Sequence, residues 1–580
     1  MISGSFQTAS AQFTFVGDYD KTFAAPLGYY IDPQNPTAPA TDTFDTIFFT
    51  GDYAPDGSII AGGRHADNDL RGDFYLRKFT ASGAIDTSFG TNGFVRTNFH
   101  SQFDGVPGND TPQILKVQPD GKILFAGQCT VLQIAPFPSP QFGQDACVVR
   151  YNANGTLDSS FGGFPILVSC GNEICSIPID PGKAIFQTGL RSDGRFGETA
   201  GIFYDMAIQP DGKIVLVGIT RNTTNSSTTT GFSAMIVRLN ANGTLDATFG
   251  SNGIARWIAP PAPAGCSLAP TQFSAVRVQP DGRIIAVGFD AITNPNNCGN
   301  GTRFVVTRWT AAGQMETVRH ITDLSLLDTF FTERAVSVHL TRDGSKVLVS
   351  GSARNFSGVP GGRQKPTMAR FNIGDLSLDT SFGSGGIAQY NRTFDSWGAS
   401  TLYVKAIQPD GKIIGYDNVS STSEVRFNPD GSGDKSFGNV DLIDFSPGGR
   451  GRLRVFVTHY NGSVVPLEIG HLLVRPNGRI NLIGSGANRA AVSQQNTTFQ
   501  NGVYADFEND GRDNISVFRD GNWYWLNSAN NSFNAAQFGI SSDKLAPADY
   551  DGDGKTDLAV FRDGAWYIIQ SSNGAFRALN

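Results

Sequence analysis

Two acidic segments near the C-terminus carry residue types that bind a hard cation. The second runs from Asp549 to Asp557 and places carboxylates at positions 1, 3, 5 and 9, with glycine at position 6. Such alternate side chains converge on one Ca²⁺ ion, and the position-7 carbonyl adds a further oxygen. Clustered carboxylates would repel one another without a cation. We therefore expect calcium to be bound by Asp549, Asp551, Asp553, Lys555 and Asp557.

The first acidic segment is a weaker copy, 43 residues earlier in the chain. Position 12 of the second loop is Val560, where an EF-hand requires a bidentate glutamate, and both loops run into β-rich segments, so we do not expect an EF-hand. Whether the first loop is occupied stays open, and a solvated acidic turn is the alternative for both. The predicted ligands of the first loop are Asp506, Glu508, Asp510, Arg512 and Asn514.

Each acidic loop leads into a matching β-rich run that ends in Trp-Tyr, at Trp523-Tyr524 and Trp566-Tyr567. This pattern resembles the FG-GAP or VCBS type of repeat, over about 501–580. The resemblance implies Asp loops that bind calcium between strands, and we expect a small β domain of two such repeats at 491–580. The second copy stops before an equivalent of 535–539, and an unfinished β unit could accept a strand from a neighbour. Self-assembly into oligomers or fibres is therefore one hypothesis.

A longer repeat organises the rest of the chain. Its phrase reads Val/Ile-Gln-Pro-Asp-Gly-Lys/Arg-Ile. Proline presets one turn dihedral, aspartate bonds its own backbone and glycine accepts a positive φ, so each copy predicts a strand, a turn and a strand. The complete copies lie at 117–123, 208–214, 278–284 and 407–413, and weaker copies surround Asp56, Asp343 and Asn477.

A second phrase, Leu-Asp-x-x-Phe-Gly, follows the first in most units and predicts two more strands with a phenylalanine plug between units. Four-stranded units around a ring make a β-propeller. The copies predict seven blades over residues 1–490 of an all-β fold, with the N-terminal strand Phe13–Val16 completing the last blade and protecting its edge. The longest unit contains an insertion, 163–200, which we expect to be a surface loop.

Together the two phrases resemble the delta-60 repeat, a bacterial family of propeller-type repeats in predicted secreted and surface proteins. The resemblance covers about 1–490 and implies the fold and a location at or beyond the cell surface. The unit around Gly313–Glu316 departs from the pattern because it lacks the Phe-Gly plug.

Six cysteines fall in close pairs along the chain, which favours local disulfides in an oxidising compartment; free buried thiols are the alternative. The net charge of −7 and the lack of a basic run argue against a nucleic-acid partner. No apolar run is long enough to span a membrane, and whether the N-terminus derives from a processed export signal stays open. The expected pairs are Cys129–Cys147, Cys170–Cys175 and Cys266–Cys298.

We find no catalytic motif in a suitable strand–turn–helix context. The sequence therefore predicts a non-catalytic secreted or cell-surface protein, structural, adhesive or ligand-binding, whose partner is a protein, a glycan or a second copy. The alternative is an extracellular polysaccharide-acting enzyme, a lyase or glycosidase, with a site at the propeller channel. Its candidate residues are Glu173, Glu198, Glu333 and His339.

Overall fold

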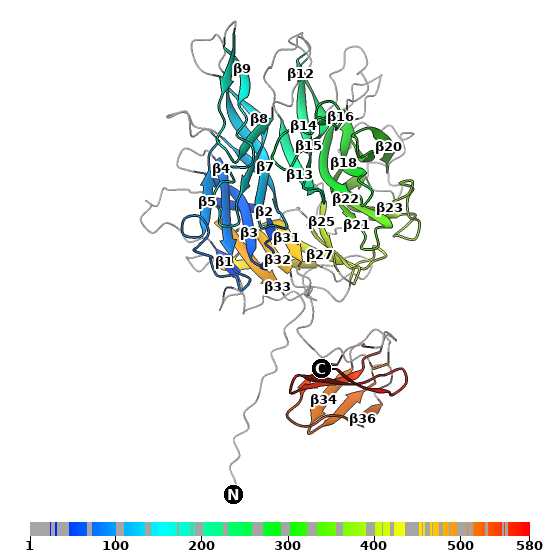
Figure 1. The fold of residues 1–580 in the computed structure, drawn as a ribbon. Coiled ribbons are helices and arrows are strands. Elements are labelled where there is room, and N and C mark those ends of the chain that lie inside the picture. Colours follow the sequence, from blue (N-terminus) through cyan, green and yellow to red (C-terminus); the bar gives the residue numbers. More distant parts are fainter. Residues whose placement is uncertain are drawn as a thin grey trace. The chain divides into compact units, whose positions relative to one another are not determined.

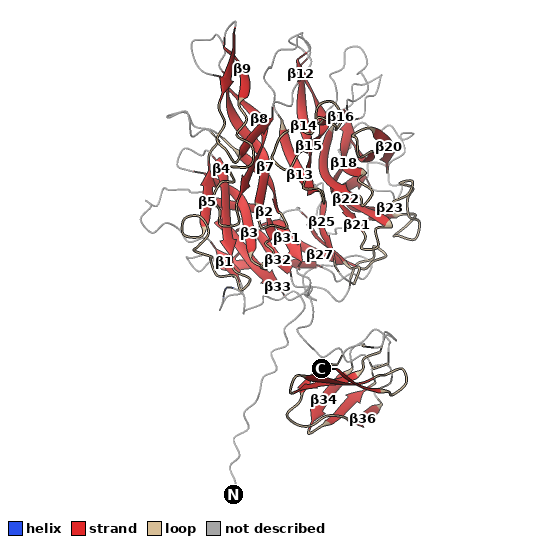
Figure 2. Ribbon diagram, in the orientation of Figure 1, coloured by secondary structure: helices blue, strands red, loops and turns tan. Residues whose placement is uncertain are grey.

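In the computed structural model, every named element is a β-strand (Figure 2). No described helix is long and apolar enough to cross a membrane. The chain divides into two compact units, Phe15–Thr497 and Thr498–Asn580 with Met1–Thr14. The structure describes residues 24, 29–31, 46–66, 72–99, 109–133, 141–170, 173–186, 190–191, 201–223, 230–257, 271–291, 302–321, 333–354, 364–389, 401–408, 410–417, 423–434, 452–454, 456–458, 464–466, 468–474, 480–486, 489–495, 507–508, 514–527, 530, 532–547, 550 and 555–579.

The larger unit consists mainly of sets of four antiparallel strands, the first of which is joined to the last strands of the unit in one eight-stranded sheet (Figure 1). The first three are β2 (Thr46–Tyr53), β3 (Ile59–Ala66), β4 (Gly72–Phe79) and β5 (Phe94–Thr97); β6 (Thr111–Val117), β7 (Ile123–Gln133), β8 (Gln141–Tyr151) and β11 (Lys183–Phe186); and β13 (Ile202–Ile208), β14 (Ile214–Thr223), β15 (Thr230–Leu239) and β16 (Ile254–Trp257). The next three are β17 (Gln272–Val278), β18 (Ile284–Ala291), β19 (Thr302–Trp309) and β20 (Met315–His320); β21 (Arg334–Leu340), β22 (Lys346–Arg354), β23 (Gln364–Asn372) and β24 (Ile387–Gln389); and β25 (Leu402–Ile407), β26 (Ile413–Asp417), β27 (Ser423–Phe427) and β28 (Arg452–Arg454).

A last set of strands joins the two ends of this unit. β31 (Glu468–Val474), β32 (Ile480–Gly486) and β33 (Arg489–Gln495) are consecutive, and β1 (Tyr29–Ile31) pairs antiparallel with β33. The N-terminal strand of this set is thus β1, whereas the predicted Phe13–Val16 lies outside the described residues. Three short pieces complete the unit: β9 (Ile166–Cys170) with β10 (Glu173–Ile177), β12 (Leu190–Arg191) beside β14, and β29 (Phe456–Thr458) with β30 (Val464–Pro466).

The first strands of the successive sheets form a closed cycle. β2 contacts β6, and the contacts continue through β13, β17, β21 and β25 to β31, which contacts β2. β2 also pairs in parallel with β33 at Thr46 and Arg489. We call these seven strands the inner strands. A ring of four-stranded sheets is a β-propeller, so the predicted all-β propeller fold is confirmed.

The insertion at 163–200 is more than a surface loop. It contains the β9–β10 hairpin, and it supplies β11, which pairs with β8 as the fourth strand of its sheet. Ile166 and Ile177 at the base of the hairpin are buried in the core between the first two sheets. The expectation of a loop was wrong here because short apolar runs inside the insertion find a sheet edge and a core to cover.

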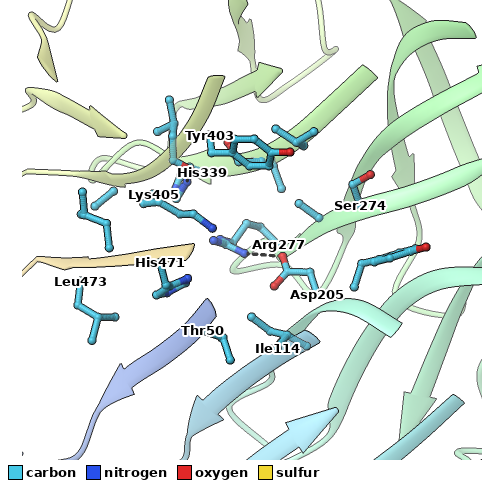
Figure 3. Close-up of a pocket in the computed structure, with 18 of the residues that line it drawn as sticks. Thr50, Ile114, Asp205, Ser274, Arg277, His339, Tyr403, Lys405, His471 and Leu473 are labelled. Atoms are coloured by element: carbon cyan, nitrogen blue, oxygen red, sulfur yellow. Dashed lines mark hydrogen bonds and ion pairs between the residues drawn. The ribbon is translucent and has the colours of Figure 1, made fainter. Parts of the chain in front are cut away.

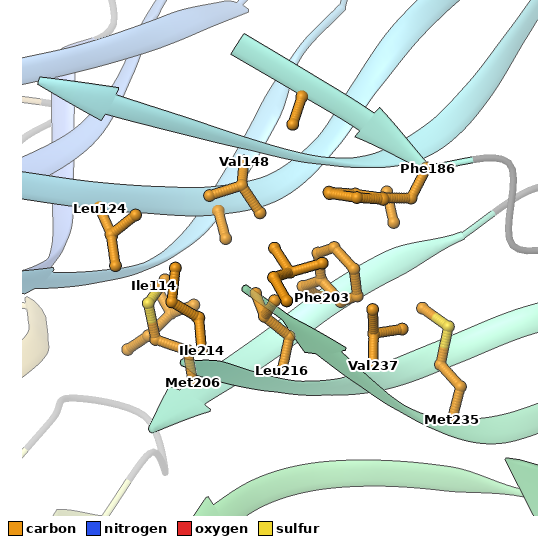
Figure 4. Close-up of a cluster of buried hydrophobic side chains, with 14 of the residues drawn as sticks. Ile114, Leu124, Val148, Phe186, Phe203, Met206, Ile214, Leu216, Met235 and Val237 are labelled. Atoms are coloured by element: carbon orange, nitrogen blue, oxygen red, sulfur yellow. The ribbon is translucent and has the colours of Figure 1, made fainter. Parts of the chain in front are cut away.

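Apolar side chains fill the space between neighbouring sheets. Figure 4 shows one such cluster, in which Leu124 and Val148 of one sheet meet Phe203, Leu216 and Val237 of the next. These five side chains are fully buried, and each contributes about 1.5–3 kcal/mol relative to an exposed position. The alternating apolar pattern of the strands therefore holds the ring together from sheet to sheet.

The second phrase forms a latch between units. In one unit the Arg238 guanidinium bonds Asp246 at 2.7 Å and lies 4.7 Å from the centre of the Phe249 ring. It also donates to the carbonyl of Ala311 in the next unit, and a Cβ on that unit's Gly313 would lie 2.9 Å from Phe249. The predicted phenylalanine plug is therefore confirmed. Equivalent latches are Arg150–Asp158–Phe161 and Arg370–Asp379–Phe382.

The unit without the Phe-Gly plug keeps the polar half of the latch. Arg308 bonds Glu316 at 2.9 Å, so a glutamate replaces the usual aspartate. The same guanidinium donates to the carbonyls of Ile373 and Gly374 in the next unit. The longer glutamate side chain thus preserves the ion pair where the phrase itself is lost.

The turn phrases behave as predicted. In the third unit the Asp211 carboxylate accepts the Lys213 amide at 3.1 Å, and Gly212 has a φ of 81°. The lysine of the same phrase reaches the latch, since its ammonium lies 3.1 Å from Asp246. The recurring turn aspartates are therefore structural.

The predicted Cys129–Cys147 disulfide is wrong, because both thiols are free and buried. Cys129 lies opposite Asp145 and Cys147 lies opposite Gly127 on β7 and β8, so the two cysteines are diagonal neighbours. Diagonal partners lie about 7–8 Å apart, whereas a disulfide needs Cα atoms about 4.4–6.8 Å apart. Burial raises the pKa of Cys147 to about 11. The side chains of the other four cysteines lie outside the described part of the chain.

The smaller unit contains two antiparallel sheets, one for each copy of the C-terminal repeat. Trp523, on the first of them, is buried and donates its indole N–H to the Phe538 carbonyl at 2.8 Å. The sheets are β34 (Ile515–Arg519), β35 (Asn522–Leu526) and β36 (Phe533–Gln537), and β37 (Lys544–Leu545), β38 (Leu558–Arg562), β39 (Ala565–Ile569) and β40 (Phe576–Leu579).

Candidate site in the central channel

Every inner strand contains a β-bulge. In β13 the register skips Tyr204, and the residue before it, Phe203, lies opposite Gly218. A Cβ on Gly218 would lie 1.9 Å from the Ile202 carbonyl oxygen, so only glycine allows this close approach. Bulges re-aim side chains at functional sites. The skipped residues are Phe49, Gln113, Tyr204, Ser274, Val336, Lys405 and Gly470.

The inner strands enclose a cavity of about 1000 Å³, which we call the channel. All of the skipped residues except Gly470 line it. The side chains labelled in Figure 3 come from different inner strands and line the same space. The channel therefore combines side chains that lie hundreds of residues apart in the sequence.

Lys405 reaches the channel through a displaced bulge. In β6, β13 and β17 the skipped residue stands five positions before the glutamine of the turn phrase, but in β25 Lys405 stands only three positions before Gln408. The matching positions in those three strands hold the fully buried residues Leu115, Met206 and Val276. The shift by two residues thus turns a position that is normally apolar and buried toward the channel.

Sequence reasoning missed Lys405, although a signal was present. In three complete copies of the turn phrase, a glycine follows the glutamine by nine residues, as in Gln209 and Gly218. After Gln408 the corresponding glycine, Gly415, follows by only seven. Since this glycine faces the bulge, the shorter spacing marks the displacement.

Two tyrosines pack beside Lys405. The rings of Tyr403 and Tyr416 are stacked with centres 5.0 Å apart, and the Lys405 ammonium lies 5.4 Å from the Tyr416 ring centre. Tyr416 also donates its hydroxyl to the Gly470 carbonyl at 2.9 Å. The ammonium therefore meets aromatic ring faces on one side, a favourable contact for a cation.

Burial and neighbouring cations act together on Lys405. Burial, together with the charges of Lys116 and Arg277 and against that of Asp205, lowers the pKa of Lys405 to about 8. The Asp205 carboxylate accepts the Val276 amide at 2.9 Å and Arg277 at 3.2 Å (Figure 3). Within the described residues, neither Lys116 nor Lys405 forms a salt bridge.

The two channel histidines are neutral at physiological pH. Burial lowers the pKa of His339 to about 3, and its Nε2 donates to the Val404 carbonyl at 3.0 Å. Burial also lowers the pKa of His471 well below its usual value, with Lys405, Lys116 and Arg277 contributing in the same direction. The positive charge of the channel thus comes from lysine and arginine.

Both carboxylates of the described lining are engaged in holding the ring. Asp52 accepts the amides of Tyr53 and Val117, each at 3.0 Å, and so bridges β2 to β6. Asp205 bridges β13 to β17 in the same way. Each carboxylate therefore has backbone amide partners on two neighbouring inner strands.

The structure places some of the residues suggested for an enzyme. His339 lines the channel, but Glu333 is buried away from its described lining. Glu173 is the first residue of β10, and Glu198 lies outside the described residues. Sequence reasoning therefore placed one of its four candidates at the channel.

Four of the ten predicted calcium ligands are described: Glu508, Asn514, Lys555 and Asp557. Asp557 accepts the Tyr550 amide at 2.9 Å and the Ser571 amide at 2.6 Å, and Asn514 accepts the Phe507 amide at 2.8 Å. The ninth position of each loop thus bonds the amide of its second position. No group of three His, Cys, Asp or Glu is placed to hold a metal among the residues that can be described, and six predicted ligands lie outside them: Asp506, Asp510, Arg512, Asp549, Asp551 and Asp553.

Comparison with known proteins agrees with the fold. Four segments match a family described as "Domain of unknown function (DUF5122) beta-propeller": 54–89, 142–161, 209–249 and 408–437. No curated protein matches the chain. The more specific resemblances that the sequence suggests, to delta-60 repeats and to FG-GAP or VCBS repeats, stay predictions.

Several solved structures are similar at low identity. Extracellular domains 1–2 of Drosophila Semaphorin 1b share 10% identity, with 83% of this chain and 87% of that chain covered and a TM-score of 0.34. The Penicillium chrysogenum alpha-L-arabinanase complexed with arabinobiose shares 10% identity, with 80% of this chain and 96% of that chain covered and a TM-score of 0.32. The β-propeller domain of the Trilobed protease from Pyrococcus furiosus shares 9% identity, with 81% of this chain and 98% of that chain covered and a TM-score of 0.27.

Proposed function

We propose that this β-propeller is a seven-bladed, non-catalytic, secreted or cell-surface protein that binds a ligand in its channel. Calcium bound by the acidic loops would stabilise its C-terminal repeats. The cycle of inner strands supports the blade count, with β1 as the outer strand of the last blade. A protein or glycan partner, or a second copy of the chain, would then be met through this scaffold.

The observation that carries the proposal is a contrast between repeated and varied positions. The Arg–Asp–Phe latch recurs with the same residue types in three units. The bulge position, in contrast, holds a different residue type in every inner strand. Repetition therefore maintains the ring, and variation is concentrated where the side chains face the channel, as expected for one asymmetric binding site.

The alternative is a polysaccharide-acting enzyme with its site in the same channel. Such a site needs paired carboxylates or an equivalent acid and base. Because Asp52 and Asp205 accept hydrogen bonds from backbone amides of neighbouring inner strands, the lining favours the binding function instead. The surface location rests on the composition and the acidic loops, since the free thiols of Cys129 and Cys147 remove one argument for an oxidising compartment.

The binding function is tested by filling the channel. The wild-type protein is screened by thermal shift against saccharides and organic acids, and each hit is repeated with Ser274→Trp, which places an indole at a channel bulge. The control is Ala312→Trp, at an exposed position of the turn between β19 and β20. Loss of binding in Ser274→Trp alone supports the proposal, whereas equal binding in all three proteins refutes a channel site. Release of shortened saccharides from a bound polysaccharide would favour the enzyme.

The calcium claim has its own test. Ca²⁺ should raise the melting temperature of the transition of the C-terminal unit, and EDTA should reverse the rise. The double variant Asp551→Ala/Asp553→Ala should lose this response while the propeller transition stays unchanged. A melting curve of the wild-type protein that EDTA leaves unaltered would refute the claim.

A further inference from the structure

Three cationic side chains from three inner strands share the channel. Lys116 comes from β6, Arg277 from β17 and Lys405 from β25, and all three line the cavity. The charges of Lys116 and Arg277 both act on Lys405. Lys405 therefore lies close enough to both of the other cations to be repelled by them.

The negative charge of the described lining does not balance this cluster. Asp205 is paired with Arg277, and Asp52 gives both oxygens to backbone amides. Arg334 and Arg342 add further positive charge at exposed positions of the lining. The channel is thus a positive cavity in a chain whose net charge is −7.

Lys405 is placed there by an exception to the repeat. Its strand moves the bulge by two residues, and the equivalent residues of other strands are buried and apolar. A protonated lysine that is partly removed from water in the channel lowers the stability of the folded protein. A ligand that supplies compensating negative charge gives a physical reason for such an exception.

We infer that the channel binds a ligand with several oxyanion groups, with Lys405 as the central contact and Lys116 and Arg277 on either side of the charge it meets. The stacked Tyr403 and Tyr416 would flank the bound group. This inference rests on the proposed binding function and adds the chemical class of the ligand. The ligand could be a free polycarboxylic acid, an acidic saccharide or an inorganic oxyanion, and the three are separated by their probes.

The test is calorimetric titration of the full chain at pH 6.5 and low salt with citrate, trigalacturonate and sodium sulfate. At least one should bind, and Lys405→Met should weaken that binding by about tenfold or more, because a charge-assisted hydrogen bond is lost. The control Lys544→Met removes an exposed lysine of the other unit and should leave affinity unchanged. Preference among the three probes identifies the source of the oxyanion.

Raising the pH should weaken binding as Lys405 loses its proton, since its pKa is near 8. Binding to wild-type should therefore fall between pH 6.5 and 9.5, and binding to Lys405→Met should fall less. The titratable and charged groups that line the channel together with Lys405 are Asp52 and Tyr53 of β2, Lys116 of β6, Tyr204 and Asp205 of β13, Arg277 of β17, Arg334 and His339 of β21, Arg342, Tyr403 of β25, Tyr416 of β26 and His471 of β31.

Other outcomes overturn the inference in distinguishable ways. If maltotriose, a neutral probe, binds in a manner that Ser274→Trp abolishes while no acidic probe binds, the binding function stands and the oxyanion class is wrong. If an acidic probe binds Lys405→Met as tightly as wild-type, Lys405 is not the contact. If neither acidic nor neutral probes respond to Ser274→Trp, the inference and the proposed function both fall.

Discussion

Replacing Lys405 with methionine should stabilise the propeller at neutral pH, although the residue is proposed to bind the ligand. Burial lowers the pKa of Lys405 from 10.5 to about 8. The protonated lysine therefore lowers the free energy of unfolding at neutral pH. Methionine has a similar length, carries no charge and can rest against the rings of Tyr403 and Tyr416.

The magnitude follows from the two pKa values. A fall from 10.5 to about 8 corresponds to about 3 kcal/mol against the protonated folded state. Loss of the contact between the ammonium and the tyrosine rings offsets about 1 kcal/mol. The net gain is about 2 kcal/mol, which is about 2 °C in melting temperature for a unit of this size.

The stability of the wild-type protein changes with pH in the direction opposite to that of a lysine stabilised by an ion pair. Between pH 8 and 10.5 the unfolded chain still binds the proton that the folded chain has released, so wild-type stability rises with pH in this window. The advantage of Lys405→Met should therefore be complete below pH 8 and absent above pH 10.5.

Scanning calorimetry of the propeller transition at pH 7 and pH 10.5 measures both effects, with Lys544→Met as the control. A lower melting temperature for Lys405→Met at pH 7 would refute the reasoning, because it would mean that the protonated lysine is stabilised by its surroundings. An advantage that is equal at both pH values would show that packing, and not the charge, is responsible.

Three further predictions concern the framework. Asp246→Asn should destabilise the ring by about 2–3 kcal/mol at pH 7, as measured by denaturant titration. Burial raises the pKa of Asp246, but hydrogen bonds from Thr248 and Lys213 and the charge of Arg238 outweigh it and lower the pKa. The destabilisation should therefore shrink as the pH falls below about 4. Gly218→Ala should destabilise by about 3 kcal/mol or more because its Cβ would meet the Ile202 carbonyl, whereas Gly374→Ala, with no atom within 4 Å, should be neutral in the same melting assay. Cys129 and Cys147 should resist iodoacetamide in the native protein and react without reductant after unfolding, as read by peptide mass spectrometry; a disulfide-linked peptide would contradict the free thiols.

The turns, the latch and the repeat were predictable because they depend on residues close in sequence. Pro-Asp-Gly sets its own dihedrals, and the latch joins Arg238 to Asp246 eight residues away and to the turn of the next copy. Repetition of such local units then implies a ring, since each copy must cover the next. The same local evidence failed for Cys129 and Cys147, because nearness in sequence says nothing of the diagonal register that separates them.

The channel was decided by the tertiary structure. Lys116, Arg277 and Lys405 lie in separate copies, and only closure of the ring brings their strands around one cavity. Which side chains face that cavity depends on where each inner strand bulges, and the bulge is set by pairing with the neighbouring strand. The seven-residue spacing from Gln408 to Gly415 carried the signal in the sequence, but its meaning is clear only from the register. The sequence by itself therefore determined the repeated framework, and the fold determined the charged site that departs from it.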